Sequence, residues 1–198
     1  MRRSSLATVL VLFVCLSASA NAVTLNVVGG QLVGASNVDV GGDLYDVVFT
    51  DGSCITLFSG CDSNSDFLFT TEAAALAVAT ALDQQVLVDG PQGDFDTVPG
   101  LTSDCGYSAV CEVYVPYMTN GTTVQVTRVE NRGLTGSDEV QGGRLLLTVS
   151  NDLSQESENY AYTYAVLTAV PIPEPSAASF FALGLGMVGL AAKRRRTN

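Results

Sequence analysis

Apolar and polar residues alternate along much of the central part of the chain, which is the pattern of strands with one buried face. Val38-Asp39-Val40 alternates, Gly41-Gly42 supplies a turn, and the run from Leu44 to Phe49 returns, so these residues predict a hairpin. Other runs rich in β-branched and aromatic residues lie at 24–28, 113–117, 122–129, 144–150 and 159–170. The pattern therefore predicts about seven strands.

A different periodicity runs from Thr71 to Leu87, where apolar residues recur every three or four positions among six alanines. This spacing predicts one amphipathic helix, with Thr70 or Thr71 as its N-cap and Glu72 in its first turn. The segment 89–100 is rich in Gly, Pro and Asp and is predicted to be a loop. One helix among about seven strands predicts an α+β or mainly β domain, built as an antiparallel sheet or a sandwich.

The N-terminal end of the chain departs from this pattern. Two arginines precede an apolar stretch at 6–16, and small-x-small sequences end at Ala20 and at Ala22. We therefore predict a signal peptide over 1–22, read by the Sec machinery and cut after Ala22 or, as the alternative, after Ala20. A lipoprotein signal that uses Cys15 is disfavoured, because the residue before it is too large for such a site.

The C-terminal end carries a second apolar run, from Ala177 to Ala192, followed by four cations at Lys193–Arg196. As a helix, these 16 residues would span roughly 24 Å of a hydrocarbon core of about 30 Å. Snorkelling cations extend such a span and hold its end in the cytoplasm. We predict a transmembrane helix over 177–192. The alternative, a buried C-terminal helix, rarely ends in adjacent cations.

Pro173, Glu174, Pro175 and Ser176 precede this span, and the three-part arrangement resembles a PEP-CTERM sorting signal. The resemblance implies a Gram-negative bacterium that makes exopolysaccharide and recognition by exosortase, a membrane transpeptidase-like enzyme. It also implies processing near the Pro-Glu-Pro motif, after which the span is discarded and the protein reaches the cell surface or extracellular matrix. We therefore divide the chain into the signal peptide, an extracytoplasmic domain at 23–170 and a sorting signal at 171–198.

The charge of the predicted domain differs sharply from that of the whole chain. Residues 23–170 hold three arginines, no lysine and nineteen of the twenty acids, a formal charge of −16 against −11 overall. A field of this sign repels nucleic acid and anionic lipid, so we exclude both as partners of the domain. It would attract divalent cations or basic surfaces, or simply keep an exported protein soluble.

Four cysteines remain after removal of the signal peptide. Cys54, Cys61, Cys105 and Cys111 are an even number in an oxidising compartment, which predicts disulfides. Three pairings are open. We favour Cys54–Cys61 and Cys105–Cys111, each closing a short turn-containing loop and stabilising by about 2–3 kcal/mol in the chain-entropy model. A zinc site is the rival, but the spacings are wide and the chain has no histidine.

One acidic cluster resembles the start of a calcium loop. Asp62, Asn64 and Asp66 place oxygen ligands at alternate positions. However, Phe67 stands where an EF-hand needs glycine and Ala73 where it needs a bidentate glutamate. Two interpretations stay open, an irregular calcium site and the favoured one, an Asx-rich turn before the helix. Calcium is thus an alternative, and no other cofactor is predicted.

A second acidic cluster contains Asp94 and Asp96, with Asp89 near them in sequence. A carboxylate pair serves glycoside hydrolysis, but the chain has no tryptophan with which to build a typical sugar cleft. The absence of histidine removes catalytic triads and histidine general bases, and oxidised cysteines would remove a thiolate nucleophile. We therefore predict that the protein is not an enzyme.

Tyrosines at alternate positions suggest a binding surface. Tyr160, Tyr162 and Tyr164 would share one face of an extended strand, either stacking on glycans or packing against the core. The prediction is an exported protein with a structural or interaction role at the surface or in the exopolysaccharide matrix. The alternatives are a calcium-dependent glycan-binding module and, third, a small carbohydrate-active enzyme that uses carboxylates alone.

Overall fold

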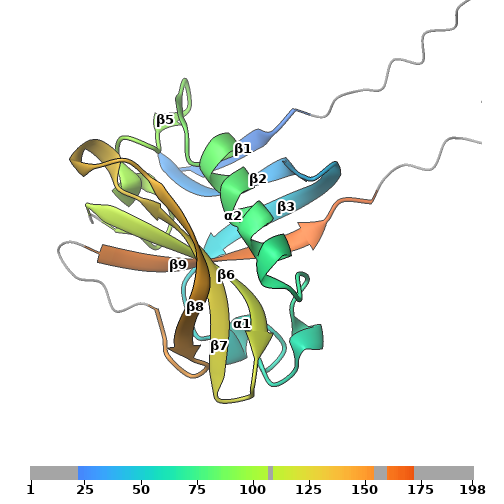
Figure 1. The fold of residues 1–198 in the computed structure, drawn as a ribbon. Coiled ribbons are helices and arrows are strands. Elements are labelled where there is room, and N and C mark those ends of the chain that lie inside the picture. The colour runs from blue at the N-terminus through green and yellow to red at the C-terminus, as the bar shows by residue number, and fades with distance from the viewer. Residues whose placement is uncertain (1–21, 107–108, 154–159, 172–198) are drawn as a thin grey trace, which may run out of the picture.

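The computed structural model describes residues 22–106, 109–153 and 160–171, which form a seven-stranded sheet with one long helix, α2, across one face (Figure 1). The order in the sheet is β1-β2-β3-β9-β6-β7-β8. The strands are β1 (Thr24–Val28), β2 (Gln31–Val40), β3 (Asp43–Thr50), β6 (Val110–Thr119), β7 (Thr123–Asn131), β8 (Glu139–Thr148) and β9 (Tyr160–Ala169). The mainly β prediction is confirmed, and the strands share one sheet rather than forming a sandwich.

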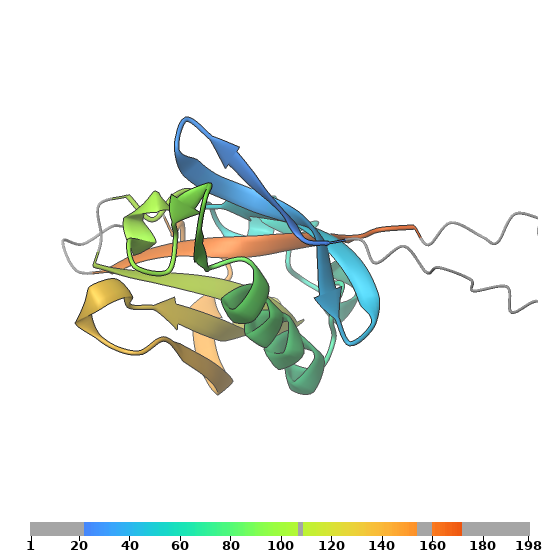
Figure 2. The same cartoon turned by 90° about the horizontal axis from the view of Figure 1, so that it is seen from above.

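The sheet departs from the antiparallel prediction at one pair. β9 inserts between β3 and β6, where it pairs antiparallel with β3 and parallel with β6. The parallel register runs from Val110 opposite Tyr160 to Tyr114 opposite Tyr164. Figure 2 shows β9 running through the middle of the molecule, with β1–β2 and β8 at opposite edges. The last strand of the domain is therefore hydrogen-bonded on both sides.

Helix α2 (Glu72–Gln85) confirms the predicted helix and its cap. The hydroxyl of Thr71 accepts a hydrogen bond from the backbone N–H of Ala74 at 3.3 Å, which satisfies an N–H that the helix leaves unpaired. The helix ends before Val86 and Leu87, whose N–H groups both bind the carbonyl of Leu82. These two residues are nevertheless buried, and both belong to the apolar cluster between α2 and the sheet.

The predicted hairpin is β2–β3, and it turns at two glycines with positive φ, Gly41 at 66° and Gly42 at 100°. The side chain of Asp39 accepts from the N–H of Gly42 at 2.7 Å and closes the turn. A bulge lies between Ala35 and Val38. The strand β2 begins earlier than its alternation suggested.

The remaining described elements are short. Cys54–Leu57 forms the one-turn helix α1, and 3-10 turns lie at Asn64–Asp66 (η1), Pro99–Leu101 (η2) and Gly133–Thr135 (η3). The predicted loop 89–100 contains a small hairpin of β4 (Asp89–Gly90) and β5 (Gly93–Asp94).

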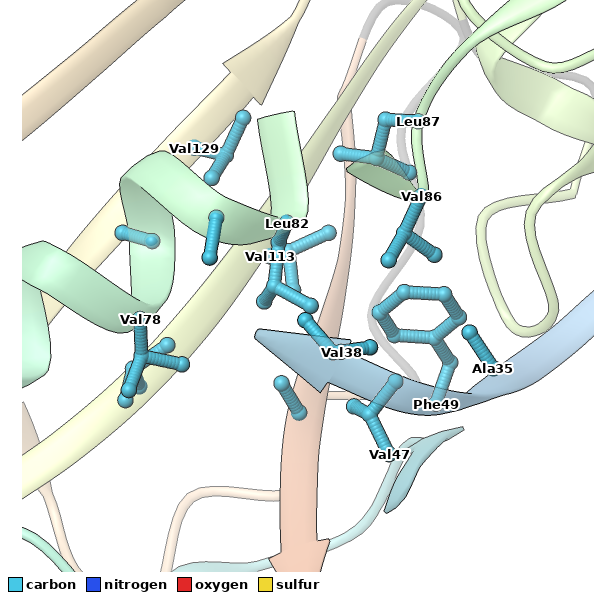
Figure 3. Packing of buried hydrophobic residues seen from close by; sticks show 14 of the residues in the cluster. Ala35, Val38, Val47, Phe49, Val78, Leu82, Val86, Leu87, Val113 and Val129 are labelled. Carbon is cyan, nitrogen blue, oxygen red and sulfur yellow. The ribbon is translucent and has the colours of Figure 1, made fainter. Parts of the chain in front are cut away.

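Both faces of the sheet are covered, each by its own apolar cluster. Between α2 and the sheet, side chains such as Leu82, Val113 and Phe49 point toward one another (Figure 3). On the opposite face, Tyr114, Tyr164 and other residues pack beneath α1 and its disulfide loop. Alternation along β6 and β9 sends successive side chains to the two clusters.

The described chain begins and ends at the same end of the molecule, where it enters β1 and leaves β9 (Figures 1 and 2). Among the described residues, no helix has the length and apolar character needed to cross a bilayer. The predicted signal peptide at 1–22 falls almost entirely outside these residues, and the predicted span at 177–192 entirely so.

Candidate functional site

The face of the sheet opposite α2 carries a pair of stacked tyrosines. Tyr114 on β6 and Tyr162 on β9 have ring centroids 5.8 Å apart and planes inclined by 14°. They are brought together by the parallel register, in which Tyr162 lies opposite Glu112, two residues before Tyr114. The ring of Tyr164 meets Tyr114 edge-on at 6.2 Å and Phe58 at 5.5 Å.

The three predicted tyrosines share this face but differ in accessibility. Tyr164 is fully buried, and burial raises the pKa of its phenol. Because it fills the core, the prediction that Tyr164 contacts a glycan is corrected. Tyr162 is half-buried and Tyr160 is 38% exposed, so these two keep accessible surface. Their binding to glycans stays a prediction.

A groove of about 540 Å³ opens beside the stacked pair. Its lining consists of Tyr114, Tyr162, Leu147 at the end of β8, and residues 150–153. Tyr114 and Leu153 are almost wholly buried and form its base, whereas residues 150–152 are exposed and form its rim.

The rim is held by backbone contacts to the segment before and within α1. The N–H of Ile55 donates to the carbonyl of Val149 at 3.2 Å, and the N–H of Leu153 donates to that of Gly52 at 3.2 Å. An isolated bridge joins Ser53 to Asp152 between them. The rim residues are thus hydrogen-bonded to the chain segment that leads into α1.

A charged network lies on the same face, next to the tyrosine pair. Glu112 on β6 and Glu130 on β7 lie directly opposite each other, and their side chains are only 6% and 4% exposed. Arg128 bridges them, with Nη1 at 2.9 Å from Glu112 Oε2 and Nη2 paired with Glu130. Arg132 pairs with Glu130 on its other side. Two of the three arginines of the domain are therefore used to neutralise these two carboxylates.

The charged network also holds Tyr114, a residue that lines the groove. The phenol of Tyr114 donates to Glu112 at 2.9 Å. Burial, together with the charge of Glu112, raises the pKa of Tyr114 well above its usual range, so the phenol stays protonated as a donor. Burial by itself would lower the pKa of Arg128, but the carboxylates of Glu112 and Glu130 together have the larger effect, so the pKa of Arg128 is raised overall. Tyr114 is thus anchored to the charged network at one edge and stacked on Tyr162 at its face.

The residues of the predicted calcium loop have backbone partners. The carboxylate of Asp66 accepts from the N–H groups of Asp62 and Ser63 at 3.0 and 3.1 Å, completing a capping box around η1. The side-chain oxygen of Asn64 accepts from the N–H of Thr119 at 2.8 Å and ties the turn to β6. These contacts match the Asx-rich turn, the favoured of the two interpretations.

In the second acidic cluster, the aspartates that lie together are not the ones that are adjacent in sequence. Asp96 lines a cavity of about 510 Å³ with Asp83 of α2, Asp89 and Asp138, whereas Asp94 is not among its lining residues. Burial and then the charge of Asp96 raise the pKa of Asp83. Asp89 instead has a lowered pKa, because its carboxylate accepts from the hydroxyl and N–H of Thr97. Across the described ranges, no three His, Cys, Asp or Glu side chains converge as they would to hold a metal ion.

Both predicted disulfides are formed. Cys54 bonds to Cys61, with Cα atoms 5.6 Å apart, and Cys105 bonds to Cys111, with Cα atoms 5.5 Å apart. The first closes α1 and the turn that follows it, and both of its cysteines belong to the apolar cluster that contains Tyr114 and Tyr164. The second ties the loop after η2 to the start of β6.

The chain beyond β9 decides the identification. Residues 171–196 match the model of the PEP-CTERM protein-sorting motif. The chain carries a PEP-CTERM sorting motif. It is accordingly an exported protein of Gram-negative type that is anchored in the membrane and then processed as an exosortase substrate. No curated protein and no solved structure gives a significant match.

The sorting motif begins where the described domain ends. The N–H of Val170 still bonds to the carbonyl of Leu44 at 2.9 Å. Pro173, Glu174, Pro175 and Ser176 lie outside the described residues. Only two residues stand between Val170 and Pro173 in the sequence, so the chain can reach at most about 10 Å from Val170 to Pro173. The motif is therefore tethered directly to a central strand.

The sequence analysis did not identify Tyr114, which lines the groove with Tyr162, or Glu112 and Arg128, the charged pair to which the Tyr114 phenol is bound. One signal was available, because Glu112 and Arg128 interrupt apolar runs in a domain with only three cations. Their convergence depends on the pairing of β6 with both β7 and β9, which a single sequence does not reveal.

Proposed function

We propose that this PEP-CTERM protein is a non-enzymatic component of the cell surface or exopolysaccharide matrix, with a structural or interaction role. The observation that carries the proposal is the sorting motif at 171–196, directly attached to a disulfide-bonded β domain. A small domain with two disulfides suits an oxidising, extracytoplasmic location.

The arrangement of the ends supports this role. The described chain enters β1 and leaves β9 at the same end of the molecule, and we infer that this end would face the membrane while the protein is anchored. The tyrosine pair lies near the starts of β6 and β9, whereas the chain leaves β9 at its other end, at Ala169. The groove is then open to extracellular material.

A non-enzymatic role is supported by the chemistry of the acidic residues. Asp89 is engaged with Thr97 and its backbone, and Asp94 does not line the cavity that Asp96 shares. Asp94 and Asp96, the pair considered for glycoside hydrolysis, therefore do not line one cavity, and Asp89, which does line it with Asp96, is held by Thr97. The chain has no histidine to replace it.

Glycan binding is the second candidate, favoured by the groove beside Tyr162. We propose it without calcium, since Asn64 and Asp66 already serve backbone donors.

Cell fractionation tests the main proposal. In a Gram-negative host with an exosortase, we expect the wild-type chain in the extracellular or surface fraction. Replacement of Pro173, Glu174 and Pro175 by alanine should retain it in the inner membrane. As a matched control, Pro91→Ala changes a proline of the domain and should leave the distribution unchanged. Equal release of the motif variant would contradict the proposal.

A further inference from the structure

We propose that the groove lined by Tyr114, Tyr162 and residues 150–153 is a binding site for a neutral polysaccharide, an inference that rests on the proposed surface or matrix role. The groove combines an aromatic and apolar base with a polar rim, as expected for a site that takes an amphipathic ligand. A pyranose ring is such a ligand, because it has a flat C–H face and hydroxyls at its edge.

The base of the groove is preorganised for stacking. Tyr162 lies flat against Tyr114, and Tyr114 is fixed by its hydrogen bond to Glu112 and its edge contact with Tyr164. The position of the Tyr162 ring is therefore set before a ligand arrives. Rigid aromatic side chains bind at a low cost in conformational entropy.

The rim supplies hydrogen-bonding groups suited to sugar hydroxyls. Ser150, Asn151 and Asp152 are exposed and line the groove, and together they include donors and acceptors. Their backbone is held by the contacts to Gly52, Ser53 and Ile55 described above. The backbone that carries the polar groups is therefore anchored next to the apolar base.

The charge of the surroundings selects an uncharged polymer. Among the described residues that line the groove, Asp152 is charged and none is a cation. Arg128, on the strand next to Tyr114, is already paired with Glu112 and Glu130. The domain has a formal charge of −16 and no lysine. A uronate or sulfate polymer would be repelled, whereas a neutral hexose polymer would not.

Affinity electrophoresis of the full chain in a nonionic detergent tests the site. Gels contain dextran, hydroxyethyl cellulose or, for comparison, the anionic polymer alginate. We expect retardation by at least one neutral polymer and none by alginate. Retardation by alginate alone or to the same degree, or by no polymer, would overturn the proposal.

Variants locate the binding on the molecule. Tyr162→Ala should weaken binding at least about tenfold, as for a central aromatic contact, and Asn151→Ala by about threefold. Tyr160→Ala is the matched control, because Tyr160 lies two residues away on the same strand but does not line the groove. An equal loss in Tyr160→Ala would assign binding to the open strand face and refute the groove.

Two further measurements separate a loss of binding from a loss of folding and from a failure of export. Near-UV circular dichroism reports whether Tyr162→Ala keeps its fold, and if it does not, Asn151→Ala carries the test, since its side chain is exposed. Unchanged binding in Asn151→Ala then counts against the site. Fractionation of the same variants should show normal export, so that failure of the groove is distinguishable from failure of the proposed surface role.

Discussion

Replacement of Arg128 by methionine is expected to destabilise the domain strongly, because it leaves two buried carboxylates without their shared cation. The side chains of Glu112 and Glu130 are 6% and 4% exposed, and that of Arg128 is 22% exposed. Breaking a buried ion pair by removing one partner costs about 3–5 kcal/mol. Since solvent reaches part of the arginine, we expect the lower end, about 3 kcal/mol, or a fall in Tm of roughly 6–12 °C.

The structure also predicts where the loss is concentrated. Glu130 keeps its pair with Arg132, whereas Glu112 keeps only the hydrogen bond from the Tyr114 phenol among the contacts described above. Adding Glu112→Gln to the arginine variant should therefore restore more stability than adding Glu130→Gln. Arg128→Lys keeps the charge but cannot bind both carboxylates through separate N–H groups of a guanidinium, so its free energy of unfolding should lie between those of wild type and Arg128→Met.

Urea denaturation followed by circular dichroism measures these differences as changes in the midpoint at constant slope. If Arg128→Met lost less than about 1 kcal/mol, the contacts of Arg128 with Glu112 and Glu130 would behave as ordinary surface ion pairs, which would contradict the expected cost of two unpaired buried carboxylates. Equal rescue by the two glutamine substitutions would show that Arg132 does not protect Glu130.

Three further substitutions test local features of the fold. Thr71→Ala should lower the free energy of unfolding by about 1 kcal/mol in urea denaturation, through loss of the α2 cap; no change would refute the cap. Gly34→Ala should be far more damaging than Gly29→Ala, because a Cβ at Gly34 would lie 2.1 Å from the Val47 carbonyl oxygen while one at Gly29 meets nothing within 4 Å; equal losses would contradict the close approach. Burial raises the pKa of Asp83, so the folded state favours the protonated carboxyl. The protonated carboxyl therefore contributes to the free energy of unfolding at low pH, and this contribution is lost as the pH rises through the pKa of the folded state. Asp83→Asn should therefore raise Tm at pH 7 by up to about 2 °C after allowance for solvent screening, and by nothing well below the ordinary pKa of 3.8; a gain that is independent of pH would point to another cause.

Features that depend on neighbouring residues in the sequence were predictable. The helix α2 follows from a cap at Thr71 and an alanine-rich run, and the β2–β3 hairpin from paired glycines between alternating segments. Both disulfides close loops of six or seven residues, and such short separations bring two cysteines together whatever the rest of the fold. Local chemistry decides each of these outcomes.

Features that depend on distant pairing were not predictable. Tyr114 and Tyr162 are neighbours only because β9 inserts between β3 and β6, and nothing in either strand's composition specifies that position. The same pairing decides that Tyr164 is buried while Tyr160 stays accessible, although all three tyrosines alternate in the same way along β9. The groove is therefore a property of the sheet topology rather than of any single segment.

The most direct test of the account is the intact mass of the protein recovered from the extracellular fraction of a host that contains an exosortase. The central claim is that the folded domain is exported and then separated from its sorting signal. We expect a chain that begins after Ala22 or Ala20, ends near Pro173–Pro175 and is four hydrogens lighter because of its two disulfides. A chain that still ends in Lys193–Arg196 would contradict processing and show a protein that stays anchored.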